Sequence, residues 1–222
     1  MDQSIESKAV LVKKKIEEDF RELNEQELEN FFDNFRNDKR TLSFIKYYNK
    51  TVLDKTKIKF SEFSYQWALH LTKKFYTYFN ENYDSLINEI RNKRDIKDFH
   101  NRFCIDNLRK RRGSFCSKLF HTILPSEFPP VDNAIRKRFN VQNEDFITSV
   151  LIIKRGYELF IKENSELINL IRKILSKSKF SYLRINELSD IRILDMYYWF
   201  KENRQGRSPA SYASKSLHDF SV

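Results

Sequence analysis

Glycine and proline are both scarce in this sequence, which has 3 Gly and 4 Pro among 222 residues. Average usage would give roughly 15 glycines and 11 prolines in a chain of this length. Tight hairpin turns, phosphate-binding loops and dinucleotide-binding loops need glycine, because they require a positive φ or a close backbone approach. The sequence contains neither GxGxxG nor GxxxxGK[ST]. The scarcity therefore excludes these nucleotide-binding motifs and favours an all-α fold.

Long apolar runs and cysteines are also scarce. The longest apolar stretch lies around Val150 to Ile153, whereas a membrane-spanning helix needs about 20 apolar residues. The opening residues, MDQSIESKAVLVKKK, have no apolar core of signal-peptide length. The two cysteines, Cys104 and Cys116, cannot form a disulfide framework. We expect a cytoplasmic protein in a reducing environment, with no membrane span.

Positive charge is present in excess. The chain has 41 Lys or Arg against 31 Asp or Glu, a formal net charge of +10. With 40% apolar and 15% aromatic residues, it is too hydrophobic to be a disordered basic protein. Residues 91–112 alone hold nine Lys or Arg against three Asp, a net charge of +6. A folded basic protein of this kind is expected to bind a polyanion, and we predict double-stranded DNA as its partner.

Apolar residues recur at helical spacing along most of the chain. Asn24 and Glu27 are expected to cap a helix reciprocally, and Asp132 or Asn133 to cap a later one. The loop PSEFPPVD divides two helical lobes, roughly 1–124 and 132–203, and a mobile tail is expected from 204 to 222. The sequence thus predicts a single two-lobed helical domain over 1–203 with a basic cleft near 109–138. Helices are expected over residues 4–23, 28–35, 41–52, 62–79, 85–94, 95–112, 115–123, 134–139, 143–161, 164–175 and 185–203.

A basic run precedes the first of the three glycines. Basic residues around a glycine turn at a helix start suit a phosphate backbone, because free N–H groups and the helix dipole add to the side-chain charge. The alternative is an ordinary solvated helix face. We predict nucleic-acid contacts at Arg109, Lys110, Arg111, Arg112, Gly113, Ser114, Arg136, Lys137 and Arg138.

The segment RGSFCSKLFHTILPSEFPPVDNAIRKRF, residues 112–139, contains a turn, a Lys-bearing helix, a Pro-rich connection and an Asp at a helix start. It resembles the helix-hairpin-helix DNA glycosylase superfamily, particularly bacterial members similar to 8-oxoguanine glycosylase. The resemblance implies that Gly113 is the hairpin glycine on the DNA backbone, Lys118 the nucleophile and Asp132 the catalytic carboxylate. The hairpin has one glycine where the family has two or three, and the interval from Lys to Asp is shorter than the family's usual one.

The chemistry that the resemblance implies requires these residue types. A glycosidic bond breaks through an oxocarbenium-like state that a carboxylate stabilises. An amine with a lowered pKa can capture the sugar as a Schiff base, once the base is flipped out of the duplex. His121 shares a helix face with Lys118 and is a candidate supporting base. Each residue also has a plain structural interpretation, as a solvated lysine, an N-cap and a satisfied buried histidine.

Two other constellations give alternative sites. Arg94 and His100 fit the loose R-x(4–6)-H pattern of HEPN ribonucleases, in which the His acts as general base and the Arg stabilises charge. His100, Cys104, Cys116 and His121 have residue types that zinc accepts, but they form no CxxC knuckle. We therefore expect neither a metal nor a cofactor.

A non-enzymatic interpretation also remains. The N-terminal helices are amphipathic and strongly charged, so they could dock a protein partner. The chain would then be a helical adaptor subunit of a nucleic-acid-processing or defence complex.

Overall fold

The computed structural model describes residues 3–21, 23–33, 39–69, 71–107, 112–177 and 183–204, without the side chains of 104–107, 203 and 204. Within these ranges the regular structure is helical and no strand occurs, so the predicted all-α fold is confirmed. The helices are α1 (Gln3–Arg21), α2 (Glu25–Asp33), α3 (Lys39–Tyr48), η1 (Asn49–Leu53), α4 (Phe60–Gln66), α5 (Lys73–Glu81), α6 (Tyr83–Lys93), α7 (Ile96–Phe99), η2 (His100–Asn107), α8 (Gly113–Ile123), α9 (Asn133–Arg138), α10 (Phe146–Glu163), α11 (Ser165–Lys177), η3 (Ile185–Glu187) and α12 (Asp190–Arg204).

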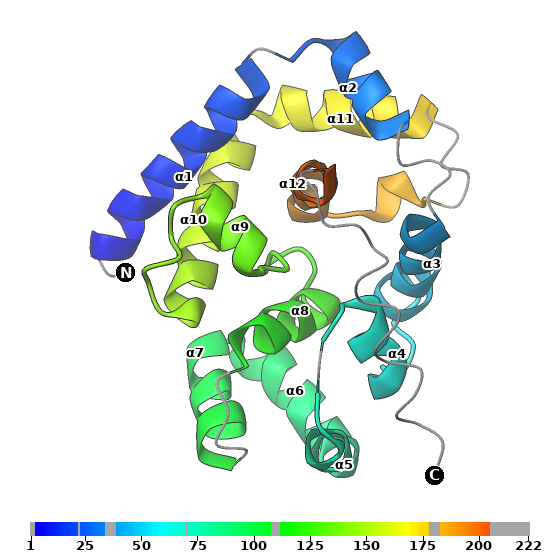
Figure 1. Ribbon diagram of the computed structural model, residues 1–222, viewed down its shortest axis with the longest axis vertical. Coiled ribbons are helices and arrows are strands. Elements are labelled where there is room, and N and C mark those ends of the chain that lie inside the picture. The colour runs from blue at the N-terminus through cyan, green and yellow to red at the C-terminus, as the bar shows by residue number, and fades with distance from the viewer. Residues whose placement is uncertain are drawn as a thin grey trace.

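The two ends of the chain fold together. Helix α1 lies along α10 and α2 packs against α11, and α12 lies beside them (Figure 1). Helices α3 to α8 form the other half of the molecule. The apolar stripe of α1 is buried in this arrangement. The spatial grouping therefore differs from the lobes 1–124 and 132–203, because α1 and α2 lie with the C-terminal helices. The stripe consists of Ala9, Val12, Ile16 and Phe20.

A glycine allows α1 to approach α10 closely. Gly156 lies in the middle of α10, and a Cβ atom built on it would stand 2.5 Å from Val12 Cγ1. Real Cβ atoms do not approach other atoms so closely, so any larger residue would push the two helices apart. One of the few glycines in the sequence is thus used for helix packing.

The capping box predicted at the start of α2 is confirmed. The Asn24 side chain accepts a hydrogen bond from the Glu27 amide at 3.0 Å. The Glu27 carboxylate accepts one from the Asn24 amide at 2.9 Å. Each side chain thus satisfies a backbone donor that the helix end would otherwise leave unpaired.

The single helix predicted over 62–79 is wrong, because the chain breaks after Gln66 into α4 and α5. Ala68 adopts a φ of 50°, and the Leu69 amide returns to the Ser64 carbonyl at 2.8 Å. The break lets the start of α4 fold onto α5, where the Phe60 ring lies 4.2 Å from the Phe79 ring. Aromatic burial between the two short helices therefore prevails over the helical periodicity that runs through both.

No helix in the described part of the chain has the length and apolarity that a membrane span requires. The predicted tail lies, beyond Arg204, outside the described residues.

Candidate active site

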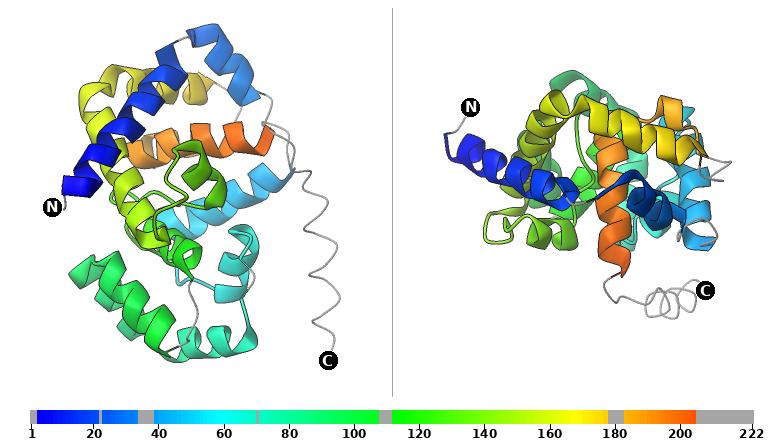
Figure 2. Two further views of the ribbon diagram at one scale, coloured as in Figure 1. Left: turned by 60° about the vertical axis from the view of Figure 1, so that its left-hand side comes forward. Right: turned by 90° about the horizontal axis from the view of Figure 1, so that it is seen from above.

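Helix α8 crosses the interior and carries polar side chains there. Nine of its residues are buried, from Gly113 to Thr122, including Ser117, Lys118 and His121. Helix α12 lies between α11 and α3 (Figure 2) and brings a second set of charged side chains into the interior. A buried polar cluster is thus assembled from α8, α12 and the loop that leads to α9.

Lys118 is a lysine that is only 8% exposed. Its Nζ donates a hydrogen bond to the Trp67 carbonyl oxygen at 3.0 Å and lies 6.0 Å from the Trp67 ring centroid. Burial lowers the pKa of Lys118, and the nearby carboxylates of Asp132 and Asp195 oppose that shift. A lysine with a lowered pKa has a larger neutral fraction, which is the form that acts as a nucleophile.

Asp132 is the N-cap of α9, as predicted. Its Oδ1 accepts hydrogen bonds from the amides of Ala134 at 2.9 Å and Ile135 at 3.0 Å. No hydrogen bond to Oδ2 is present among the described residues. The carboxylate is close enough to Lys118 to raise the lysine pKa against the effect of burial. The structure therefore places the two residues within electrostatic reach of each other and leaves one carboxylate oxygen available.

The loop before Asp132 is fastened to α8. Ser117 Oγ donates to the Pro129 carbonyl at 2.9 Å and accepts from the Val131 amide at 2.7 Å. One turn later, His121 Nδ1 is hydrogen-bonded to the Phe128 carbonyl at 2.7 Å. Because both anchors and Lys118 belong to one helix, the loop has a fixed position relative to the lysine. The sequence analysis missed Ser117. Its spacing of four residues from His121 predicts that both side chains lie on the same face of α8.

Both nitrogens of His121 are used. Nε2 lies 3.0 Å from the Tyr48 hydroxyl. Burial, with the Arg192 charge nearby, lowers the pKa of His121 to about 3, so the ring is neutral. A carbonyl only accepts, so Nδ1 carries the proton to Phe128, and Tyr48 donates to Nε2. His121 therefore ties α8 both to the loop and to α3.

Helix α12 contributes a buried ion pair that the sequence analysis missed. Arg192 and Asp195 are 4% and 3% exposed and are joined by a hydrogen-bonded salt bridge. The Arg192 guanidinium also lies 4.9 Å from the Tyr48 ring centroid. Burial raises the pKa of Asp195. The sequence pattern that could have predicted this pair is the run IRILDMYYWF, which holds two opposite charges three residues apart among apolar residues. Charges in such an apolar helix are expected to pair with each other in the interior.

One buried hydroxyl beside this cluster has no hydrogen-bond partner among the described residues. Tyr157 on α10 is fully buried, and its hydroxyl makes no hydrogen bond within the described ranges. Burial raises its pKa, and the charges of Asp195 and Asp132 raise it further, which places both carboxylates nearby. Buried polar atoms in proteins are nearly always satisfied. The Tyr157 hydroxyl is thus an exception among the buried polar groups of the described structure.

The predicted DNA-contacting run divides at Arg112. Arg109, Lys110 and Arg111 lie outside the described residues. Arg112 is the N-cap of α8, and Ser114 is half-buried. Gly113 is buried, and a Cβ atom on it would lie 2.5 Å from the Phe146 ring. Close packing of α8 against the start of α10 accounts for this glycine.

The second predicted basic run is largely engaged within the chain. The Arg136 guanidinium donates to the carbonyls of Gln142 and Glu144 and lies 4.6 Å from the Phe146 ring centroid. Arg138 forms an ion pair with Asp19 of α1. Lys137 is exposed. Two of the three cations therefore hold α9 to its neighbours.

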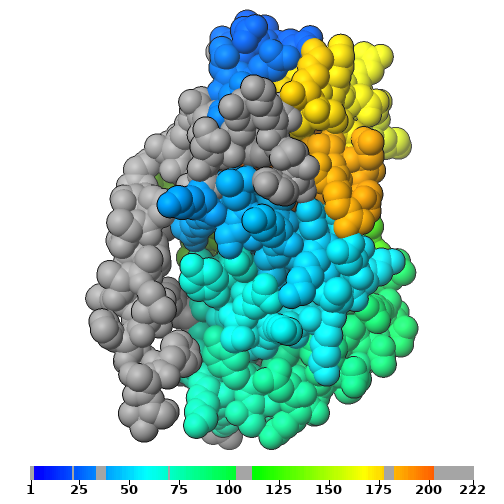
Figure 3. Space-filling view, turned by 90° about the vertical axis from the view of Figure 1, so that its right-hand side faces the viewer, coloured from blue at the N-terminus to red at the C-terminus, as the bar shows by residue number. Residues whose placement is uncertain are grey.

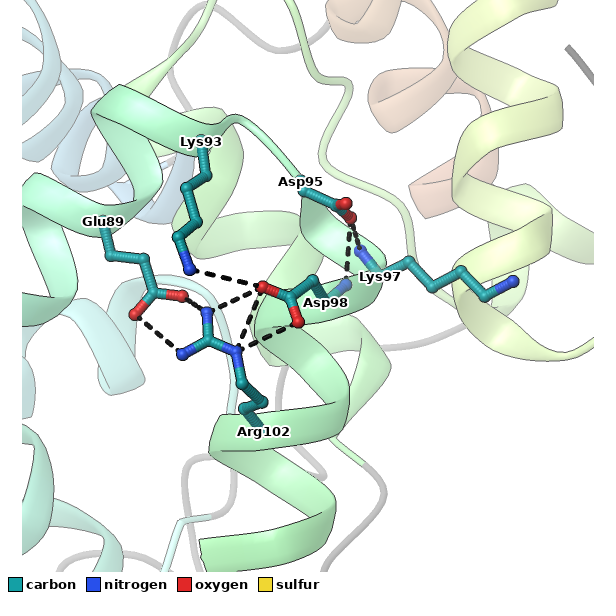
Figure 4. Close-up of polar contacts among 6 residues, drawn as sticks. All are labelled: Glu89, Lys93, Asp95, Lys97, Asp98 and Arg102. Carbon is teal, nitrogen blue, oxygen red and sulfur yellow. Dashed lines mark hydrogen bonds and ion pairs between the residues drawn. The ribbon is translucent and has the colours of Figure 1, made fainter.

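The described part of the stretch 91–112 is also partly neutralised. Arg102 binds the carboxylates of Glu89 and Asp98, and Lys93 Nζ lies 3.7 Å from Asp98 (Figure 4). Arg94, just before this cluster, forms a 2.9 Å ion pair with Glu127. Carboxylates from α6, α7 and the loop after α8 thus pair three of the cations of this segment, Lys93, Arg94 and Arg102.

The alternative sites gain no support from this geometry. Arg94 is paired with Glu127, and His100 is buried with 8% exposure. For zinc, no group of three His, Cys, Asp or Glu side chains gathers anywhere in the described residues. Both nitrogens of His121 are occupied, and the side chain of Cys104 lies outside the described part.

The amphipathic face considered for a protein partner packs within the chain. The buried stripe of α1 faces α10, and Val10 and Leu11 remain exposed at 38% and 62%.

No protein-family model matches the sequence, and comparisons with curated proteins and with solved structures give no match. Functional conclusions for this chain therefore come from the geometry of the buried cluster.

Proposed function

We propose that this protein is a base-excision DNA glycosylase/lyase in which Lys118 is the nucleophile and Asp132 the stabilising carboxylate. The observation that supports this most is the setting of Lys118. It is a buried lysine whose described hydrogen-bond partner is a main-chain carbonyl, and it forms no ion pair within the described residues.

A buried ammonium without an ion pair is expensive for the fold. Removing a charged group from water costs several kcal/mol unless a counter-charge compensates it. A methionine would fill the same space without that cost. Strongly perturbed ionisable groups cluster at functional sites, so the presence of a lysine at this buried position favours a chemical role.

The proposed reaction uses the neutral amine of Lys118. Its Nζ lone pair forms a bond to the sugar C1′ while the C1′–N bond to the base breaks, and the base leaves with the bonding electrons and takes up a proton. The amine then loses its own proton and the sugar ring opens to a Schiff base. Burial, which lowers the lysine pKa, favours the amine form in the first step.

Asp132 is suited to the charge that develops. The C1′ centre becomes positive as the glycosidic bond breaks, and a fixed carboxylate stabilises it. Oδ1 is held by two amides of α9, which fixes the group, and no hydrogen bond to Oδ2 is present among the described residues. The anchors at Ser117 and His121 keep this carboxylate in register with α8.

Borohydride trapping tests the proposal. The protein is incubated with duplex DNA bearing a panel of damaged or modified bases, and sodium borohydride reduces any imine to a stable amine. We expect a covalent protein–DNA adduct from the native chain and none from Lys118→Met. The matched control is Lys154→Met, a partly buried lysine paired with Glu158 on α10, which should keep the adduct.

Two results would contradict the proposal. One is an adduct of undiminished yield in the Lys118→Met variant. The other is no adduct with any modified base, together with RNA cleavage that is lost in His100→Ala, which would favour the ribonuclease alternative. Circular dichroism and thermal unfolding of each variant separate loss of chemistry from loss of fold.

A further inference from the structure

A second basic region of the chain lies on α3 to α5. Residues 39–81 contain nine Lys or Arg against three acidic residues, Asp54, Glu62 and Glu81. This excess of six equals the net +6 of residues 91–112, on which the sequence analysis concentrated.

The cations at the start of α3 and α5 have no carboxylate partner among the described residues, whereas Arg94, Arg102 and Arg138 each have one. Asp54 is paired with Arg184, which precedes η3, and Glu62 stands 4.0 Å from Lys50. Four exposed cations lie in the first turns of α3 and α5 and form no ion pair within the described residues. They are Lys39, Arg40, Lys73 and Lys74.

The first half of α3 lies near the point that Lys118 reaches, and α5 follows α4 on the same side of the molecule. The first half of α3 contacts the end of α4, where Gln66 Nε2 donates to Ser43 Oγ at 3.0 Å. The Trp67 ring lies 4.7 Å from the Phe44 ring, and the Trp67 carbonyl accepts the hydrogen bond from Lys118. Helix α5 starts six residues after Trp67. Helices α3, α4 and α5 thus share one face of the molecule, which Figure 3 shows from outside.

An electrostatic contact connects this face with the lysine. Burial is the main cause of the lowered Lys118 pKa, and the charge of the exposed Arg40 adds to it. Arg40 is therefore within electrostatic reach of Lys118 while its side chain is exposed to solvent.

The placement of these cations is unfavourable for the free protein. Cations in the first turn of a helix oppose the helix dipole, and neither α3 nor α5 has an acidic residue there to compensate. A bound polyanion relieves both the dipole conflict and the mutual repulsion. The chain also exposes an aromatic side chain on this face, Tyr65 of α4, at 72%. Exposed aromatic rings beside cations stack on unpaired bases.

We propose that Lys39, Arg40, Lys73 and Lys74, together with Tyr65, form the surface that binds the backbone of duplex DNA and leads it to Lys118. The choice of DNA rests on the proposed function. The surface is named the α3–α5 face below. It differs from the 109–138 region that the sequence alone favours.

Salt-dependent binding tests this surface. The four cations are changed together to glutamine, and binding of a labelled duplex is measured by fluorescence anisotropy over a range of salt concentrations. Each lost phosphate contact lowers the slope of log K against log[salt] by about 0.9, so four contacts lower it by about 3.6. We expect affinity near 0.1 M salt to fall on the order of 10³-fold.

The matched control removes four charges elsewhere. Lys14, Arg21, Lys162 and Lys173 are exposed on α1, α10 and α11, and their joint change to glutamine lowers the net charge equally. We expect a reduction in slope smaller than about 1, because only the general field is weakened. Equal losses in the two variants would overturn the inference, since binding would then follow net charge alone.

The assay separates this inference from the proposed function. If the native chain forms the borohydride adduct and the α3–α5 variant binds like the native chain, the inference fails and the function stands. If the variant loses binding while the native chain forms no adduct, the function fails and the surface stands.

The variant Tyr65→Ala tests the stacking role separately. Weaker binding of duplexes with an unpaired base, with the salt slope unchanged, supports the α3–α5 face. Unchanged binding of those duplexes argues against the stacking role.

Discussion

Residues 39–80 and residues 91–138 are both rich in Lys and Arg, but their side chains have different surroundings. In the described part of 91–138, Arg94, Arg102 and Arg138 have carboxylate partners. On the α3–α5 face, four exposed cations have none within the described residues. A cation that holds two helices together is not available to a phosphate. The comparison teaches that clustered charge in a sequence does not show which residues can bind a ligand.

The two regions meet at α8. Lys118 reaches the Trp67 carbonyl, and His121 is bonded to the Tyr48 hydroxyl. Trp67 and Tyr48 belong to the first region, whereas α8 and its loop belong to the second. The second region therefore supplies the proposed chemistry and the first supplies the proposed DNA surface.

The largest effect on stability is expected at Arg136, which we interpret as structural. Arg136→Ala removes hydrogen bonds to Gln142, Glu144 and Ser149 and should lower the free energy of unfolding by about 3 kcal/mol. Urea denaturation measures it. Lys137→Ala, at an exposed neighbour, should change stability by less than about 0.5 kcal/mol. If Arg136→Ala and Lys137→Ala lowered the free energy of unfolding equally, the distinction between cations that hold helices together and cations that can bind a ligand would be lost.

A pH-dependent effect of similar order is expected at His121, the contact between the regions. Its folded-state pKa of about 3 lies below the usual value of about 6.5, so the unfolded chain takes up the proton first. Because the folded state holds His121 neutral, its contribution to the free energy of unfolding is complete above about pH 6.5. That contribution is lost as the pH falls toward 3, by about 1.4 kcal/mol per pH unit.

The measurement compares native protein with His121→Gln, which keeps a donor and an acceptor but does not titrate. Between pH 6.5 and pH 5 the native chain should lose about 2 kcal/mol more than the variant. Parallel pH profiles would show that the imidazole is not held neutral between Phe128 and Tyr48.

A smaller loss of stability is expected from a change at Gly113, which the sequence associates with a DNA-contacting turn. Gly113→Ala places a methyl group 2.5 Å from the Phe146 ring and should destabilise the fold by about 1–2 kcal/mol through overpacking. Thermal unfolding reports the change. A variant of native stability but weaker DNA binding would instead restore the contact that the resemblance implies.

The smallest effect has the opposite sign. Lys73→Glu replaces a cation with an anion in the first turn of α5, which has no acidic residue. The favourable interaction of an anion with the helix dipole predicts a gain in stability of about 0.3–1 kcal/mol, while DNA affinity should fall. Chemical denaturation measures the gain in stability, and fluorescence anisotropy on the same sample measures the loss of affinity. A loss of stability would show that Lys73 has a structural role.

The helices and caps were largely predictable, because they depend on local signals. Periodic apolar residues and the pair Asn24 and Glu27 suffice for α1 and the start of α2. The break at Ala68 was not predictable, since it depends on Phe60 packing against Phe79, two residues far apart in the chain.

The candidate site was predictable in part for the same reason. Lys118 and Asp132 were named from their local segment, and Asp132 is the cap that its position before a helix predicts. The environment of Lys118 comes from Trp67, Arg40 and Asp195. Those residues are brought to α8 only by tertiary packing, so no pattern around Lys118 contains them.

Peptide mapping of the borohydride-reduced adduct tests the central claim most directly. After nuclease digestion, the sugar remnant is located in the protein by mass spectrometry. The account predicts the remnant on Lys118, with an adduct that disappears in Lys118→Met. A remnant on an exposed lysine such as Lys73, or spread over several lysines, would contradict it, because the account makes the buried amine of Lys118 the specific nucleophile.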